Sequence, residues 1–239
     1  MRILLLTLFF FTCFSNAVDN EKFVIAIDPG HSKNHFGAVS SRGIPEYNFN
    51  IAIANVLLRK LQEHNKVDAF IINLDGVDIS LKERTQTAKK RKANLYISLH
   101  HDSVQQKYIS YWKYEGKKNH YSDNFKGYSI FISNKNVEKD DSLKFSKFLG
   151  EEFRKFGFVP TLHHSEKIKG ENRKLLDKTL GIYRFDDLIV LKTASMPAVL
   201  IECGVIVNRE EELLVSSDEF KEELANAIVI AILKYSEKE

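Results

Sequence analysis

The chain has 239 residues, enough for one sizeable hydrophobic core and too few to require two domains. Apolar residues make up 44% of it and charged residues 28%, as in ordinary soluble globular proteins, and the net charge of +3 is too small to indicate binding to nucleic acid or an anionic membrane. Because eight histidines stand beside only two cysteines, imidazole is the expected source of any metal site.

Residues 1–17 are predicted to be a signal peptide. A basic residue precedes an apolar run from Ile3 to Phe14, and small residues follow at the positions that a signal peptidase needs. The run is short for a permanent membrane anchor, so we expect no stable membrane insertion after cleavage. The mature chain, residues 18–239, is therefore expected to be exported, either to the periplasm or out of the cell. Its remaining cysteine, Cys203, would have no internal disulfide partner.

Short apolar runs rich in Val, Ile, Phe and Leu recur along the chain. This composition is typical of strands that are buried on both faces, as in a parallel sheet covered by helices. The predicted strands are KFVIAID (22–28), VDAFIINL (67–74), NLYISL (94–99), YSIFIS (128–133), LIVL (188–191) and AVLIE (198–202).

Amphipathic stretches lie between these runs. Helices are predicted over residues 46–64, 81–92 and 141–157, and a C-terminal helix follows a capping box made by Ser216 and Glu219. Strands that alternate with helices predict an α/β fold: a mostly parallel twisted sheet with helices on both faces, in three layers.

Two segments do not fit this alternation. Residues 103–127 are polar but rich in aromatic rings, and residues 160–186 are charged and only weakly periodic. We expect both to be long excursions from the core, and such loops are often functional.

Polar side chains follow three of the predicted strands. His31 comes just after the first strand, His100 ends the third, and Glu202 ends the last. Glu46 opens the first helix. Since ligands of parallel sheets bind beyond the carboxyl ends of the strands, we expect these four side chains to meet there, although they lie far apart in the sequence.

Two imidazoles and a carboxylate are a ligand set that suits zinc, and a catalytic zinc keeps one further position open for water. Magnesium or calcium would prefer more oxygen ligands. A remaining carboxylate could move the proton of that water. The residue types alone thus favour a metal-dependent hydrolase.

Three blocks of the sequence resemble those of the zinc-dependent N-acetylmuramoyl-L-alanine amidases. They are IAIDPGHSKNHFGAVSSRGIPEYNFNIAIANVLLRKL, LKERTQTAKKRKANLYISLHHDS and MPAVLIECGVIVNREEE, in the order that the family has them. The resemblance spans roughly Phe23 to Leu214. It implies a single zinc amidase domain with the fold of zinc-dependent exopeptidases.

The resemblance also implies site residues and a reaction. The family's zinc ligands fall on His31, Glu46 and His100, and its catalytic glutamate falls on Glu202. The implied reaction is hydrolysis of the amide between N-acetylmuramic acid and L-alanine in peptidoglycan, a cell-wall remodelling step used in daughter-cell separation. One Zn²⁺ per chain and a peptidoglycan substrate follow from it.

The sequence departs from the family pattern at several positions. Ser32 and Lys33 replace the usual glycines, Asn94 replaces a common aspartate, and His101 replaces a small residue. The stretch after Gly204 lacks an aromatic residue that is often present. None of these changes removes a proposed ligand. We predict that His101 and the following Asp102 lie behind the ligands rather than bind the metal.

The ring-rich segment raises a hypothesis about substrate. Tyr111, Trp112 and Tyr114 could form a wall for the sugar or the stem peptide, and ordinary loop packing is an equal alternative.

The charged segment raises a hypothesis about regulation. Some cell-division amidases that this sequence resembles carry an inserted helix that blocks the zinc until a protein activator moves it. Glu166 or Glu171 could fill the fourth coordination position in that way, and a loop along the substrate groove is the favoured alternative because the segment is short.

Two other functions remain open from the sequence. A zinc peptidase that cuts the peptide stem could use the same ligands and fold. A non-catalytic wall-binding protein is disfavoured because all four chemical positions are filled.

Overall fold

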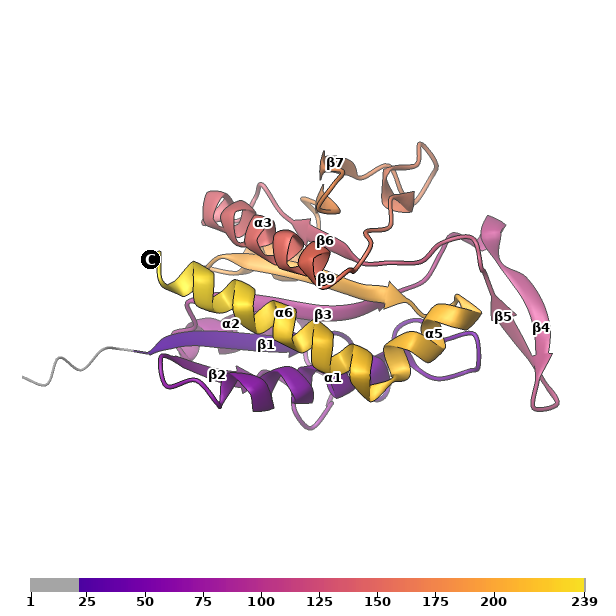
Figure 1. Cartoon of the computed structure of the whole chain (residues 1–239), viewed down its shortest axis with the longest axis horizontal. Coiled ribbons are helices and arrows are strands. Elements are labelled where there is room, and N and C mark those ends of the chain that lie inside the picture. The colour runs from indigo at the N-terminus through magenta and orange to yellow at the C-terminus, as the bar shows by residue number, and fades with distance from the viewer. Residues whose placement is uncertain (1–21, 239) are drawn as a thin grey trace, which may run out of the picture.

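A seven-stranded sheet organises the protein in a computed structural model that describes residues 22–238 (Figure 1). The predicted signal peptide, residues 1–17, lies outside the described residues. The spatial strand order is β2-β1-β3-β9-β6-β8-β7. In chain order, these strands are β1 (Phe23–Pro29), β2 (Val67–Ile71), β3 (Leu95–Asp102), β6 (Ser129–Ile132), β7 (Lys174–Asp177), β8 (Ile182–Arg184) and β9 (Ala198–Val205).

The sheet is mostly parallel, as predicted. Strands β2, β1, β3 and β9 pair in parallel, whereas β6 runs antiparallel to β9, and β7 runs antiparallel to β8. The carboxyl ends of β1, β3 and β9 therefore meet at one edge. Ile25 and Ile27 of β1 face one side and Ala26 faces the other, and all three are fully buried. Burial on both faces explains why these strands are continuous apolar runs.

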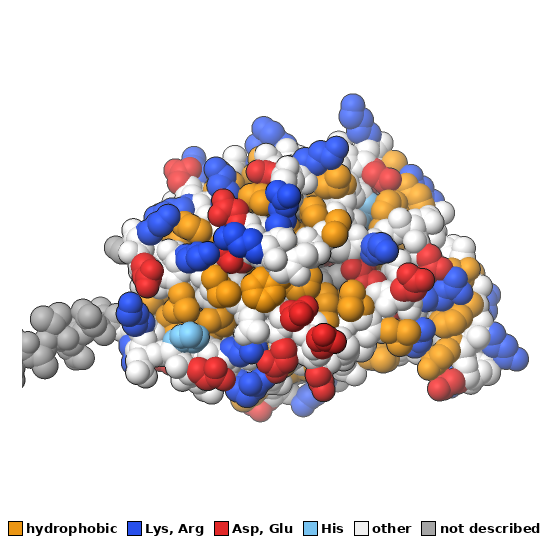
Figure 2. All heavy atoms as spheres, in the orientation of Figure 1, with side chains coloured by type: hydrophobic (Ala, Val, Ile, Leu, Met, Phe, Trp, Pro, Cys, Tyr) orange, Lys and Arg blue, Asp and Glu red, His pale blue; other side chains and the backbone are white. Residues whose placement is uncertain are grey.

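Helices cover both faces of the sheet, which confirms the predicted three layers. One face packs against α1 (Glu46–Leu61), α3 (Lys139–Lys155) and α6 (Asp218–Ser236), and the other against α2 (Leu81–Lys90) and α4 (Ile189–Thr193). Each large apolar side chain buried in these layers stabilises the fold by about 1.5–3 kcal/mol. The outer surface on the α6 side carries charged groups of both signs between apolar side chains (Figure 2). Among residues 22–238, no helix combines the length and apolar character that crossing a bilayer requires.

Two local predictions were wrong. The run LIVL (188–191) is not a strand but leads into α4, because a run this short has no periodicity that separates a strand from one buried turn of helix. The N-cap of α6 is Ser217, whose Oγ accepts a hydrogen bond from the backbone N of Phe220 at 3.2 Å. Ser216 instead ends α5 (Arg209–Ser216) and donates to the carbonyl of Glu212.

The ring-rich segment, residues 103–127, forms a short 3-10 turn, η1 (Gln106–Tyr108), and then a hairpin of β4 (Ser110–Tyr114) and β5 (Lys117–Tyr121). The hairpin extends beyond the sheet on the side of α5, so an excursion from the core was correctly expected here (Figure 1).

The charged segment, residues 160–186, is an excursion only in its first part, which contains the 3-10 turn η2 (His163–Ser165). Its second part was wrongly expected outside the core, because β8 pairs with β6 in the main sheet. Ile182 and Tyr183 of β8 are fully buried there, and this burial provides the free energy that holds the strand in place.

Candidate metal centre

Three elements bring the predicted ligands to the carboxyl edge of the sheet. His31 follows β1, Glu46 is the first residue of α1, and His100 lies near the end of β3. The parallel pairing of β1 with β3 places Pro29 beside Leu99, so the two histidines that follow come out next to each other. His31 has a φ of 71°, an uncommon conformation for a residue with a side chain, which the surrounding contacts must maintain.

The three ligand groups converge. His31 Nε2 lies 3.1 Å from Glu46 Oε2, and His100 Nδ1 lies 2.9 Å from Glu46 Oε1. The two imidazole ring centres are 4.9 Å apart. One nitrogen or oxygen atom from each of the three residues lies within 4.8 Å of the others, which is a spacing that one metal ion could bridge.

Two glycines make room for this approach. A Cβ atom at Gly30 would lie 2.2 Å from the His100 ring. At Gly37, where φ is +78°, a Cβ would lie 2.3 Å from Glu46 Oε2 and 2.5 Å from the ring of His31. Both positions require glycine because the backbone itself forms the wall of the site.

The carboxylate of Glu46 is held by several donors. Its Oε2 accepts from the backbone N of Ala38 at 2.9 Å, and its Oε1 accepts from Asn50 Nδ2 at 3.1 Å and from the backbone N of His101 at 3.3 Å. Burial alone would raise the pKa of Glu46, but its contacts with His100 and His31 outweigh that effect and lower the pKa. The group is therefore ionised and ready to bind a cation.

A buried ion pair positions the His31 loop from behind. Arg84 of α2 donates to Asp28 Oδ1 at 2.6 Å and also to the backbone carbonyls of Pro29 and His31. The hydroxyl of Tyr96 donates to the other oxygen of Asp28. This network was not predicted from the sequence. A signal for it was available, because an aspartate lies inside the apolar run IAIDPG and a buried charge needs a partner.

Glu202 lies next to His100. The two residues are directly paired in the register of β3 and β9, so their side chains stand side by side on one face of the sheet. Glu202 Oε2 is buried and has no hydrogen-bond partner among the described residues. Burial, followed by the nearby charges of Asp102 and Glu46, raises the pKa of Glu202 well above its ordinary value. A carboxyl with a strongly raised pKa beside such a cluster is a candidate acid–base group.

These observations fit a bound metal ion. Two imidazole nitrogens and an ionised carboxylate point at a common centre, and a neighbouring buried carboxyl oxygen is left unpaired. That donor set is one of those that catalytic zinc sites use.

The three rings of the proposed substrate wall lie on β4. Trp112 Nε1 donates to the carbonyl of Ser41 at 2.8 Å, and its ring stacks on Tyr114 at 5.4 Å with the Arg42 guanidinium over both. Tyr111 is 57% exposed. The hairpin is thereby attached to the loop that joins His31 to α1.

The two glutamates of the proposed occluding segment have partners outside the three converging ligands. Glu171 contacts His164 and Gln105, and Glu166 accepts from the hydroxyl of Tyr108. The structure thus brings Glu171 to a histidine of its own segment rather than to the three converging ligands. Sequence reasoning missed His164 and its neighbour His163, for which the adjacent pair HH was the available signal.

His101 lies behind Glu46. Its ring is buried and its Nδ1 lies 2.8 Å from Asn50 Oδ1, and burial lowers the pKa of His101 to about 3. The ring is therefore neutral at ordinary pH and serves to hold Asn50, which in turn holds Glu46.

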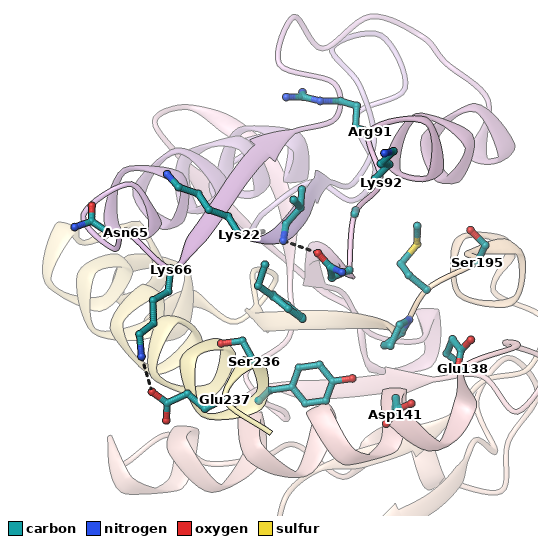
Figure 3. A pocket seen from close by; sticks show the side chains of 17 residues that line it. Lys22, Asn65, Lys66, Arg91, Lys92, Glu138, Asp141, Ser195, Ser236 and Glu237 are labelled. Carbon is teal, nitrogen blue, oxygen red and sulfur yellow. Dashed lines mark hydrogen bonds and ion pairs between the residues drawn. The ribbon is translucent and has the colours of Figure 1, made fainter. Parts of the chain in front are cut away.

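A separate hollow lies at the opposite edge of the sheet, near the amino ends of β1, β3 and β9 (Figure 3). Basic side chains such as Lys22, Lys66 and Arg91 surround it, and Lys66 Nζ lies 3.5 Å from Glu237 Oε1. None of the predicted site residues lines this hollow.

The parallel sheet and the three converging side chains that could hold a metal ion at its carboxyl edge fit the class of metal-dependent hydrolases. The family described as N-acetylmuramoyl-L-alanine amidase matches residues 25–234, and the chain belongs to this family. The resemblance predicted from the sequence is thereby confirmed, together with the expected fold and enzyme class.

Individual relatives match most of the chain in sequence or in fold. A putative N-acetylmuramoyl-L-alanine amidase of Buchnera aphidicola subsp. Baizongia pistaciae is 29% identical over 215 residues, which cover 89% of this chain and 95% of the relative. The crystal structure of an N-acetylmuramoyl-L-alanine amidase from Clostridium difficile 630 superposes with a TM-score of 0.71 at 23% identity, covering 91% of this chain and 98% of that one. The CwlD amidase of Clostridioides difficile, solved in complex with the GerS lipoprotein, gives a TM-score of 0.63 at 22% identity, covering 91% of this chain and 100% of that one.

Proposed function

We propose that this chain hydrolyses the amide bond between N-acetylmuramic acid and L-alanine in peptidoglycan, using a zinc ion held by His31, Glu46 and His100. The convergence of these three side chains on one centre, next to the unpaired carboxyl of Glu202, is the observation that carries the proposal. Membership of the amidase family supplies the substrate class.

The proposed metal ligands and Glu202 have different roles in this reaction. A zinc ion bound there would polarise the scissile carbonyl and lower the pKa of a water molecule towards neutrality. With a cation bound beside it, Glu202 would be ionised despite its burial. It would then accept the proton of the attacking water and deliver it to the alanine nitrogen as that nitrogen leaves. The pairing of β3 with β9 sets Glu202 beside His100 and so positions its carboxyl next to the proposed ligands.

The hairpin is the proposed wall for substrate. Trp112 and Tyr114 form a stacked pair that is attached to the ligand loop, and Tyr111 offers an exposed ring. Stacking of a flat ring against the face of a sugar or a peptide is the interaction such a surface provides. Replacing Tyr111 with alanine should raise KM and leave the melting temperature unchanged, because the ring is exposed. An unchanged KM would count against the wall.

The biological setting follows from the substrate. The predicted signal peptide supports export to the periplasm or the outside of the cell, where peptidoglycan lies, and a role in daughter-cell separation is the proposed occasion. The complex of a structurally similar amidase with a lipoprotein supports the proposal that a protein activator acts on this chain.

Product analysis tests the function. Purified sacculi are digested with the chain, with the chain plus a chelator, and with the chelated chain after zinc is restored. The proposal predicts zinc-restorable release of intact stem peptides with a new L-alanine amino terminus. Cleavage inside the stem would identify a peptidase instead. Binding to sacculi without any fragment would identify a non-catalytic wall-binding protein.

A further inference from the structure

A second group of ligand-type side chains lies beside the first. Asp102, at the end of β3, meets His163 and His164 of η2, and one ligand atom from each lies within 4.8 Å of the other two. Asp102 Oδ2 is 3.1 Å from His163 Nε2 and 2.9 Å from His164 Nε2. We call these three residues the Asp-His-His cluster.

The three converging atoms of the cluster make no hydrogen bond. Asp102 Oδ2, His163 Nε2 and His164 Nε2 are all buried without a hydrogen-bond partner among the described residues, although both nitrogens come within 3.1 Å of the oxygen. These two contacts are ion-pair distances without a well-formed hydrogen bond. A buried polar atom left without a hydrogen bond destabilises the fold, and a cation shared by all three would remove that cost.

The other polar atoms of the same side chains are paired. His164 Nδ1 lies 3.0 Å from Glu171 Oε2, and His163 Nδ1 lies 2.8 Å from Thr161 Oγ1. Asp102 Oδ1 accepts from the backbone N of Ser103 at 2.7 Å. Histidines that bind a metal generally have the second ring nitrogen held by a carboxylate or another polar group, which orients the free nitrogen toward the ion. The cluster has this arrangement at both rings.

Aromatic packing fixes the two rings. The ring centres of His163 and His164 are 4.0 Å apart, so the adjacent residues present their imidazoles on the same side of η2. Phe125 lies 4.8 Å from His163, and Phe131 lies 4.9 Å from His164. The cluster is therefore assembled before any ion arrives, which reduces the entropy lost on binding.

The charges around the cluster also favour a cation. The carboxylates of Asp102 and Glu171 lie in this region, and no lysine or arginine among the described residues forms an ion pair with either of them. Asp102 and His164 both interact electrostatically with Glu202, which Glu46 also approaches. Glu202 thus lies close to both the first ligand group and the Asp-His-His cluster.

We propose that Asp102, His163 and His164 form a second metal site, which binds zinc or a similar late first-row divalent cation next to the first site. Two imidazoles and one carboxylate suit such ions and suit magnesium or calcium poorly. The alternative is an ion pair of Asp102 with protonated His164: burial lowers the pKa of His164, but the carboxylates of Asp102 and Glu171 outweigh it and raise that pKa to about 10. A zinc count separates the two. This site is additional to the catalytic centre and does not depend on the proposed reaction.

Metal counting tests the proposal. The purified chain is loaded with zinc, dialysed, and analysed for zinc per chain by mass spectrometry of the element. The proposal predicts two equivalents in the wild type, one in His163→Ala and one in His164→Ala. The variant His64→Ala, whose half-buried residue lies after α1 and outside both groups, is the matched control and should keep two.

The variant His31→Ala separates this proposal from the proposed function. It should lose one equivalent and keep the other. A wild type with a single equivalent that only His31→Ala removes would overturn the second site and leave the proposed function standing. Retention of both equivalents in His31→Ala would contradict the catalytic site instead.

A measurement on the wild type covers the case in which a buried histidine cannot be replaced without unfolding. Native mass spectrometry of the intact chain, titrated with zinc, should show saturation at two added ions. Saturation at one ion, with the cluster variants merely less stable, would mean that the cluster is a structural ion pair and would overturn the proposal.

Discussion

Glu202 combines burial, an unpaired oxygen and a raised pKa in one side chain. If it carries the proton in the reaction, Glu202→Gln should lower kcat by about 10²–10⁴-fold, the usual contribution of an acid–base group. The amide is nearly isosteric, so the variant should fold and keep its zinc. Steady-state kinetics on sacculi, combined with a metal count, checks this, and a kcat within a few-fold of the wild type would remove Glu202 from the mechanism.

Glu211 is a second carboxyl with an unusual environment. Its oxygens accept hydrogen bonds from the backbone N of Gly127 and of Val205, but burial outweighs these and raises the pKa of Glu211 to about 7. The folded state therefore holds this proton more tightly than the unfolded state. Stability should be greatest below the unfolded pKa and should fall as pH rises from about 4.5 to about 7, by about 3 kcal/mol in total.

The variant Glu211→Gln isolates this effect because the amide does not titrate. Urea unfolding at a series of pH values should show that the wild type loses stability relative to the variant across that interval. Two curves that run parallel between pH 4.5 and 8 would mean that the carboxyl is not perturbed in the folded protein.

At the scale of the element, the loop between β1 and α1 must approach the ligands without a side chain at Gly37. Gly37→Ala should weaken zinc binding by roughly 10–100-fold, because the new Cβ displaces Glu46 and His31. Gly116 is a matched control, since it has the same φ of +78° and nothing within 4 Å of an added Cβ. Zinc titration of both variants checks this: equal losses would mean that backbone strain, and not the close approach, is responsible.

Helix α2 supports the site through Arg84. Replacing Arg84 with methionine leaves Asp28 buried without its ion-pair partner, so we expect a loss of about 3–5 kcal/mol in the free energy of unfolding. The loop that carries His31 should also lose order, since Arg84 binds its carbonyl. Arg59→Met, which breaks an exposed ion pair with Glu222, serves as the control and should melt close to the wild type. Similar melting temperatures for the two variants would contradict the role of the buried pair.

Across the whole molecule, the elements that were predicted correctly are those with a distinctive hydrophobic pattern. Buried parallel strands are apolar throughout, so five of the predicted runs were recognisable, and the polar residues that end three of them marked one edge of the sheet. The run LIVL was misassigned because four apolar residues fit a strand and a turn of helix equally well. The pairing of β8 with β6 could not be predicted, because a three-residue strand carries almost no signal.

The parts of the site that the sequence did not reveal depend on contacts between distant segments. His163 and His164 meet Asp102 only because the chain returns from β6 and α3 to the edge where β3 ends. Arg84 and Asp28 are likewise brought together by the packing of α2 against the sheet. Local periodicity carries no information about contacts between distant segments. The two adjacent histidines in the charged loop could therefore not be assigned to a site from the sequence.

The central claim is that His31, Glu46 and His100 hold one metal ion at the carboxyl edge of the sheet. Anomalous diffraction from crystals of the zinc-loaded chain, measured on both sides of the zinc absorption edge, tests it most directly. The account predicts a peak at about 2.0–2.2 Å from a nitrogen of each histidine and from an oxygen of Glu46. An ordered site whose three side chains surround no anomalous peak at saturating zinc would contradict it.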